Sequence, residues 1–376
     1  MRITEIHTHV LAQELDEPFG MSQWFWRSRG ACLVEVRTDE GITGWGECYG
    51  PGKSNAAIIA ELFTPALMGR DPIERTVVWQ QLYNRTRDYG RKGLPICALS
   101  GIDIALWDIA GQAAGQPIHR LLGGPFDTEL SCYASTFYYP ADGEDLAALE
   151  RDAEALLAKG FRAAKMKVGG ASAAHDAARV ARARAVLGPE IGLAVDSNRA
   201  HTAAKAIAFG RRIEDHDILW FEEPVAPEDI TGYQEVRRAL AMPIAGGESE
   251  YTSFGFRDFL AARCVDIAQP DLTACGGITE GLRIAALTHA AGVSLYPHVW
   301  GSAVGLAAAL QFTAALPDTV PSRGTTRPLI ELDQSPNAFR DDLSDLHTGP
   351  VTRVPDGPGL GITIDREVLA RFSVPD

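Results

Sequence analysis

The sequence predicts an α/β protein in which a smaller N-terminal α+β part precedes a parallel (β/α)7β barrel. The first observation is a change of pattern near residue 128, where short apolar runs begin to alternate with amphipathic helices. The second is the number of runs, because eight strands with seven helical crossovers suit a barrel whose last crossover is altered. A doubly wound sheet is the alternative, but no Gly-rich phosphate-binding loop follows the first strand.

Periodicity in the first part predicts an antiparallel meander followed by helices. Strands are predicted at residues 3–10, 32–37 and 41–48, and helices at 55–67, 73–88 and 94–114. Between the first two strands, residues 19–30 are expected to form a loop that contains Trp24, Phe25 and Trp26. These aromatic residues form either a lid over a site or ordinary packing. Asp103 and Asp108 on the last helix are interpreted as cap or solvent-face residues.

Glycine and proline residues at 123–125 mark the end of the first part. The barrel strands are predicted at residues 130–135, 163–168, 192–195, 218–221, 243–245, 265–268, 293–296 and 329–332. A last strand at 360–364 is expected to return to the first part. The predicted domains are therefore 1–125, 126–340 and 341–376.

Composition bounds the possible partners and the compartment. The chain of 376 residues has a formal net charge of −14, which argues against nucleic acid or an anionic membrane as a partner. A small anionic substrate needs only a local positive site. No apolar run is expected to span a bilayer, and the six cysteines are scattered as in a reducing compartment. The sequence predicts a cytoplasmic protein.

Two lysines on one short apolar strand are the first candidate site residues. Lys165 and Lys167 lie two positions apart, so they point to one side of the strand and Met166 to the other. Two buried cations are costly unless anionic or catalytic groups compensate them. A solvated edge strand is the alternative interpretation.

Acidic residues end the following predicted strands at a regular spacing. Asp196, Glu222 and Glu248 are separated by 26 residues each, which is one strand–helix unit. Side chains at the carboxyl ends of barrel strands converge, and three carboxylates repel unless a cation lies between them. Oxygen ligands favour Mg²⁺, with Mn²⁺ as a substitute. Independent helix caps are the alternative.

Other residues near these strand ends are candidates for the same site. Glu223 is expected to point away from Glu222, so that only Glu222 is a ligand. Asn198 and Glu250 each follow a carboxylate by two positions. Asn198 is expected to hydrogen-bond a substrate oxygen or a lysine, and Glu250 to contact substrate. Three residues end the last three strands: Asp271, His298 and Glu331. An acid that orients an imidazole is a device of acid/base catalysis, whereas a core histidine is the alternative for the histidine alone.

These motifs resemble the enolase superfamily in its mandelate racemase branch. The resemblance rests on Lys165-x-Lys167, Asp196-x-Asn198, Glu222-Glu223-Pro224, Gly247-Glu248, Asp271 and His298. Segments 98–108 and 356–362 are also similar to that family, so the resemblance covers nearly the whole chain. It implies a modified TIM barrel with an N-terminal capping domain that the C-terminal tail completes. The loop with Trp24 and the loop at 49–55, with Tyr49, would shape specificity.

The resemblance also implies roles for the site residues. The three carboxylates would bind one Mg²⁺, and Lys167 and the His298–Asp271 pair would be acid/base groups on opposite faces of the substrate. Lys165 would contact the substrate carboxylate, and Glu331 the developing enediolate. Lys165 and Mg²⁺ would also lower the pKa of Lys167, so that its neutral form can act as a base.

The implied reaction is abstraction of the proton α to a carboxylate in an acid sugar or its lactone. Segments 297–301, 308–312 and 330–333 are most similar to cycloisomerases that open aldarolactones by syn elimination. Acid-sugar dehydratases share the catalytic set, and a base on each face also permits racemisation or epimerisation of hydroxy or amino acid derivatives. A non-catalytic metal-binding scaffold is the alternative from another class. The resemblance implies a homo-oligomer, from a dimer to an octamer.

Overall fold

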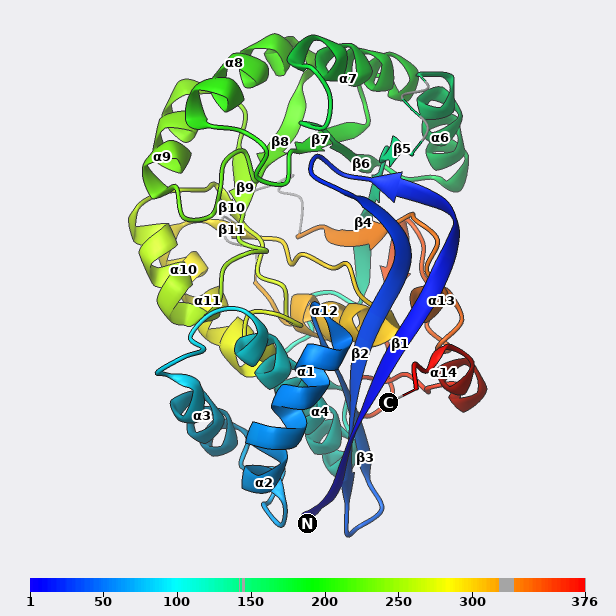
Figure 1. Ribbon diagram of the computed structural model, residues 1–376, viewed down its shortest axis with the longest axis vertical. Coiled ribbons are helices and arrows are strands. Elements are labelled where there is room, and N and C mark those ends of the chain that lie inside the picture. The colour runs from blue at the N-terminus through cyan, green and yellow to red at the C-terminus, as the bar shows by residue number, and fades with distance from the viewer. Residues whose placement is uncertain (142, 144–145, 318–327, 376) are drawn as a thin grey trace.

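The computed structural model describes residues 1–141, 143, 146–317 and 328–375. A four-stranded antiparallel sheet belongs mainly to the first part, and a nine-stranded sheet to the second. In Figure 1 the helices α6 to α11 surround the parallel strands, and the long hairpin of β1 and β2 reaches across them. The predicted fold class, a (β/α)7β barrel with an α+β capping domain, is confirmed.

The barrel strands follow one another around the sheet in chain order. They are β4 (Glu129–Thr136), β6 (Ala163–Lys167), β7 (Gly192–Asp196), β8 (Ile218–Glu222), β9 (Ile244–Gly246), β10 (Ile267–Ala268), β11 (Ser294–Leu295) and β12 (Ile330–Asp333). The first strand, β4, pairs in parallel with both β6 and β12. A doubly wound sheet is thereby excluded, because its last strand does not return to its first. In the described residues no ladder joins β11 to β12, so the sheet is curled rather than fully closed.

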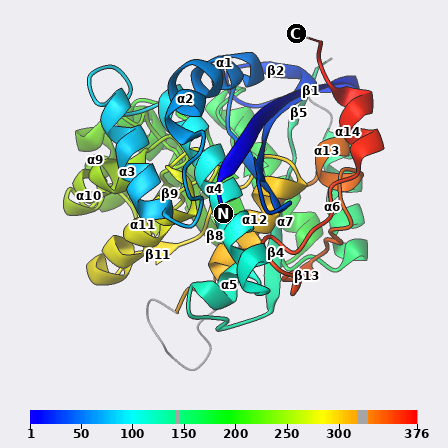
Figure 2. The ribbon, with the colours of Figure 1, turned by 90° about the horizontal axis from the view of Figure 1, so that it is seen from below.

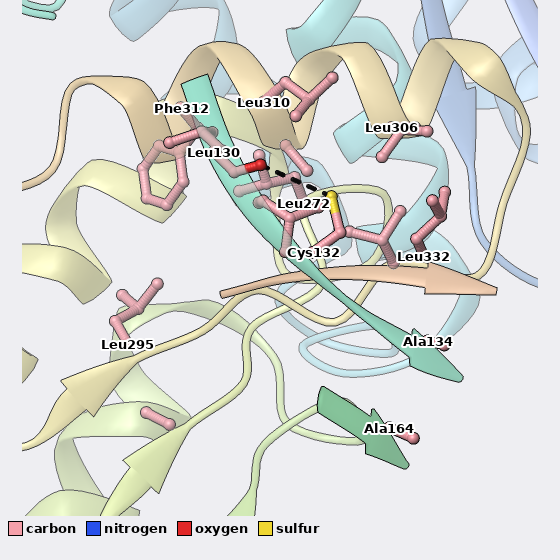
Figure 3. Packing of buried hydrophobic residues seen from close by; sticks show 14 of the residues in the cluster. Leu130, Cys132, Ala134, Ala164, Leu272, Leu295, Leu306, Leu310, Phe312 and Leu332 are labelled. Carbon is pink, nitrogen blue, oxygen red and sulfur yellow. Dashed lines mark hydrogen bonds between the residues drawn. The ribbon is translucent and has the colours of Figure 1, made fainter. Parts of the chain in front are cut away.

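In the part of the chain that the structure describes, seven helices connect these strands and cover the outside of the sheet. They are α6 (Leu146–Lys159), α7 (Ala173–Leu187), α8 (Ala203–Ile213), α9 (Ile230–Ala239), α10 (Thr252–Ala261), α11 (Gly277–Ala291) and α12 (Ala303–Ala314). Every residue of α12 is buried, as expected for a helix that is apolar on all sides. Figure 3 shows Leu306, Leu310 and Phe312 of this helix packed near Leu130 and Leu332 of two neighbouring strands.

The hairpin of the first part is longer than the sequence predicts. Strands β1 (Ile3–Gly20) and β2 (Phe25–Thr38) pair as far as Gly20 and Phe25, so the expected loop at 19–30 is wrong. Phe19 and Gly20 also pair with β5 (Tyr139–Pro140), which lies far along the chain. This partner stabilises the outer end of the hairpin. Local periodicity could not predict it, because it is distant in the sequence. The third strand is β3 (Thr43–Cys48).

Helix α4 (Leu94–Ala114) is the central helix of the first part. The other segments are α1 (Gly52–Ile58), a π-helical turn (Ile59–Phe63), α2 (Thr64–Leu67), α3 (Arg75–Thr86) and α5 (Ile118–Leu121). Contrary to expectation, α4 is long and apolar enough to cross a membrane, but 89% of its most apolar window is buried inside the protein. It packs so closely on β3 that a Cβ at Gly46 would overlap the carbonyl oxygen of Gly101.

The C-terminal tail contacts both parts of the molecule. After α13 (Ala338–Asp341), β13 (Val351–Arg353) pairs with β4 of the barrel, while α14 (Arg366–Phe372) lies against β1 (Figure 2). The predicted strand at 360–364 is wrong, because only isolated bridges form there. Gly359 and Gly361 adopt positive φ angles of 73° and 74°, which interrupt extended backbone.

The two aspartates of α4 are buried, contrary to their interpretation as cap or solvent-face residues. Asp108 is 4% exposed and accepts hydrogen bonds from the backbone N–H of Trp45 (2.9 Å) and of Leu360 (2.8 Å), one on each oxygen. Asp103 is 2% exposed and accepts from the backbone N–H of Thr279 with Oδ2 (2.8 Å). Each carboxylate thus accepts a hydrogen bond from buried backbone N–H groups of segments that pack on α4.

We expect Asp108→Asn to lower the free energy of unfolding by about 1–3 kcal/mol, because the new amide faces a buried N–H donor. Asp103→Asn is the matched control on the same helix. It should cost less than about 1 kcal/mol, because only one oxygen of Asp103 accepts a bond from the backbone. Urea denaturation of both variants tests this. Equal losses would contradict the role assigned to the second oxygen of Asp108.

Candidate active site

Charged side chains gather at the carboxyl ends of the parallel strands. Lys165 is 1% exposed and Lys167 is 9% exposed, so a solvated edge strand is excluded. Met166 points to the other side of β6 and joins the main apolar cluster. Strand β7 ends at Asp196 and β8 at Glu222, which are partners in the parallel register.

Asp196, Glu222 and Glu248 form the carboxylate triad, in which one oxygen of each residue lies within 4.8 Å of the others. The described N-caps of the following helices are Thr202, Asp229 and Tyr251, so these carboxylates are not independent helix caps. The chain reaches Glu248 through Gly247, whose φ of 128° disfavours any other residue.

The triad has the properties of a site for a hard cation. Burial raises the pKa of Glu222, and Asp196 raises it further, although Lys165 opposes this. The described partners of Glu248 are the imidazole of His298 at 3.4 Å and the guanidinium of Arg199 at 3.8 Å. The side-chain oxygen of Asn198 is buried without a hydrogen-bond partner among the described residues. An all-oxygen set with unused acceptors fits a divalent ion such as Mg²⁺.

The two lysines bridge the carboxylates from the side of β6. Nζ of Lys165 lies 2.5 Å from Oε1 of Glu222 and 2.9 Å from Oε1 of Glu331. Nζ of Lys167 lies 2.5 Å from Oδ2 of Asp196. Burial has the largest effect on the pKa of Lys167 and lowers it, and Lys165 lowers it further. Asp196, Glu248 and Glu222 together raise it, so the net shift is upward. The predicted lowering of this pKa is therefore not provided by the described residues around Lys167.

A histidine and an aspartate lie on the opposite side of the triad. Nδ1 of His298 is 2.7 Å from Oδ2 of Asp271, and Nε2 is 3.4 Å from Oε2 of Glu248. Thr273 fixes Asp271 by donating to its Oδ1 from both the backbone and the hydroxyl. Burial lowers the pKa of His298, but Glu248, Glu331 and Asp271 raise it to about 10.

Glu331 accepts hydrogen bonds from Lys165 and, at 3.2 Å, from the backbone N–H of Val299. Burial raises its pKa, but Lys165 and then His298 lower it to about 2. Ionised Glu331 would repel an enediolate, so its contacts favour a role in holding Lys165.

The other candidate residues have different partners in the structure. The ring of Tyr49 lies 6.1 Å from that of His298. Asn198 donates its backbone N–H to Asp196, and its carbonyl accepts from Gln23 at the end of the β1–β2 hairpin. Glu250 instead pairs with Lys92 at 2.7 Å.

Trp24 lies in the hairpin turn, is 43% exposed, and has its described ring contact with Trp26. Glu223 leaves strand geometry with a φ of 42° and accepts from the hydroxyl of Ser249. The expected loop at 49–55 is shorter than predicted, because α1 begins at Gly52.

Two arginines at this end of the barrel were missed by sequence reasoning. Arg199 directly follows Asn198 and lies 3.4 Å from Glu223 and 3.8 Å from Glu248. Its position three residues after Asp196 could have identified it. Arg29 of the hairpin lies 3.9 Å over the ring of Trp300, and the three aromatic residues near it in sequence are a stronger local signal.

Comparison with known families is consistent with this geometry. Residues 4–123 match the mandelate racemase / muconate lactonizing enzyme N-terminal domain, and residues 148–368 match the enolase C-terminal domain-like family. The chain belongs to the mandelate racemase/muconate lactonizing enzyme family. The resemblance inferred from the motifs is confirmed.

Relatives in this family extend over nearly the whole chain. A D-galactarolactone cycloisomerase of Agrobacterium fabrum is 41% identical, and the match covers 100% of both chains. An arabinonate dehydratase of Saccharolobus solfataricus is 35% identical over 90% of this chain and 89% of its own. The crystal structure of a 3,6-anhydro-D-galactonate cycloisomerase from Zobellia galactanivorans is 37% identical, with a TM-score of 0.90 and complete coverage of both chains.

We expect Glu248→Gln to weaken Mg²⁺ binding by about 100-fold or more, because the amide removes one anionic oxygen from the triad. Glu250→Gln is the control, since Glu250 is a buried acid two residues away that pairs with Lys92. It should change the affinity less than about threefold, as titration calorimetry would show. Unchanged affinity in Glu248→Gln would contradict the proposed ligand set.

Proposed function

We propose that this protein is an Mg²⁺-dependent cycloisomerase that abstracts the proton α to the carboxylate of an aldarolactone and opens the ring. One observation carries the proposal: acid/base candidates flank the carboxylate triad on both sides. Lys167 contacts Asp196, while His298, oriented by Asp271, lies next to Glu248. A metal-binding scaffold would not need such groups. The similarity to a D-galactarolactone cycloisomerase over the full length supports the choice of substrate.

Each residue then has a distinct task in the reaction. Bound Mg²⁺ would supply positive charge next to the substrate carboxylate, where abstraction of the α-proton adds negative charge. Lys165, whose pKa is raised by Glu222 and Glu331 against the effect of burial, remains a fixed cation on the same side. Lys167 or the His298–Asp271 pair removes the proton, and the group on the other side delivers or holds one.

The ring opening conserves all atoms of the substrate. The α C–H bond breaks, and the bond between the β-carbon and the ring oxygen breaks as that oxygen leaves within a carboxylate. The resulting enol takes up a proton at the β-carbon and becomes a 2-keto acid. A dehydratase is the second candidate, supported by the 35% identical arabinonate dehydratase. Its hydroxide leaving group needs a proton, which an acid on either side could give.

We expect D-galactarolactone, with Mg²⁺ in D₂O, to give a 2-keto-3-deoxy acid with deuterium incorporated from solvent, as NMR would show. Arabinonate and galactonate should react at least about 100-fold more slowly, because open-chain acids lack the carboxylate leaving group. Preferred turnover of open-chain acids would identify a dehydratase instead. Exchange of the α-proton without elimination would indicate a racemase or epimerase.

Lys167→Met and His298→Asn should each lower kcat by about 10³-fold, because each removes one proton-transfer group. His289→Asn, at an exposed position of α11, is the control and should leave kcat unchanged. Exchange of the α-proton with solvent should survive in whichever of the two variants keeps the base and lacks only the general acid. If exchange survives in both variants, the two-group assignment is wrong.

We also propose, from the family, a homo-oligomer between a dimer and an octamer. Sedimentation velocity of the purified protein measures this directly.

A further inference from the structure

Behind the end of strand β6 lies a buried polar cluster that the proposed reaction does not use. The positioning cluster consists of Arg179 and Asp176 on α7 and Tyr139 on β5. The hydroxyl of Tyr139 donates to Oδ1 of Asp176 at 2.6 Å, and the guanidinium of Arg179 lies 4.1 Å from the centre of the Tyr139 ring. Arg179 and Asp176 are each 1% exposed. Buried charges of this kind need specific partners.

Those partners are backbone groups next to Lys167. Arg179 donates to the carbonyl oxygen of Lys167 at 2.7 Å. Asp176 accepts from the backbone N–H of Gly169 at 2.8 Å, and the hydroxyl of Tyr139 accepts from that of Gly170 at 3.0 Å. The cluster therefore fixes the chain at Lys167 and at the turn that directly follows it.

A second strand is fixed by the same guanidinium. Arg179 also donates to the carbonyl oxygen of Phe137 at 3.0 Å, just beyond the end of β4. Phe137 has a φ of 52°, a conformation that costs free energy unless the surroundings hold it. One planar guanidinium thus joins the ends of β4 and β6 through two separate nitrogens. A lysine is a poor substitute, because its three N–H donors radiate from one nitrogen and lack the planar fork.

We propose that Arg179, with Asp176 and Tyr139, is a positioning residue that holds Lys167 in the geometry for proton transfer. This inference rests on the proposed function, in which Lys167 exchanges a proton with substrate. Displacing a reacting group by about 1 Å can cost about 100-fold in rate. Loss of the guanidinium fork therefore affects the chemical step more than the binding of substrate or metal.

The test compares two arginines on the same helix. Arg179→Lys should lower kcat for D-galactarolactone by about 10- to 100-fold, with KM and the Mg²⁺ affinity changed less than about threefold. Arg184→Lys is the matched control, because Arg184 also donates to backbone carbonyls, those of Gly188, Ile191, His216 and Asp217, away from Lys167. Equal loss of kcat in both variants, or parallel changes in KM and metal affinity, would overturn the proposal.

Tyr139→Phe provides a second variant that removes one hydroxyl and keeps the ring on Arg179. Amide hydrogen exchange of residues 165–172 should become about tenfold faster in this variant and in Arg179→Lys, and remain unchanged in Arg184→Lys. Unchanged exchange in both of the first two variants would refute the positioning role even if no substrate were turned over. Absence of turnover by the unaltered protein would refute only the proposed function.

Discussion

Buried charge at the mouth of the barrel is the constraint on which the rest of the structure depends. Around the carboxylate triad, the described residues include six carboxylates and four basic groups, one of them an imidazole. They are Asp196, Glu222, Glu223, Glu248, Asp271 and Glu331, with Lys165, Lys167, Arg199 and His298. With every acid ionised and the imidazole protonated, the acids would outnumber the cations by two, which one divalent ion would balance. Burial raises the pKa of Glu222 and of Glu223, and a bound cation would favour their ionised forms. The fold must therefore hold each group firmly, because an unpaired buried charge is costly.

The first part of the chain provides much of that rigidity. Glu47 of β3 accepts from the backbone N–H groups of Ser302 and Gly305 at the start of α12. Asp103 of α4 does the same for Thr279 at the start of α11. These helices follow the segments that carry His298 and Asp271, so the capping sheet and helix fix the acid/base pair from outside the barrel. Anionic side chains at helix N-termini also suit the helix dipole.

Local periodicity is sufficient to predict features that depend only on the spacing of residues within one strand. The shared face of Lys165 and Lys167 and the positions of Asp196 and Glu222 follow from each residue's place in its own strand. Glu248, Asp271 and His298 are predicted at strand ends but lie just beyond β9, β10 and β11. The length of the β1–β2 hairpin, the burial of Asp108 and the pairing of Glu250 with Lys92 depend on segments distant in the chain. No pattern of single residues contains that information.

The protonation of Lys167 and His298 likewise depends on neighbours that are distant in the sequence. Both acid/base candidates contact a carboxylate of the triad, Lys167 through Asp196 and His298 through Glu248, and both have raised pKa values. A cation held by those carboxylates would weaken both attractions at once, since the same negative charge would then be shared. In the proposed function the triad would thus have two effects: it would provide the ligands for a metal, and it would couple metal occupancy to the availability of a neutral base. The sequence identifies the groups, but only the structure gives their distances from the triad.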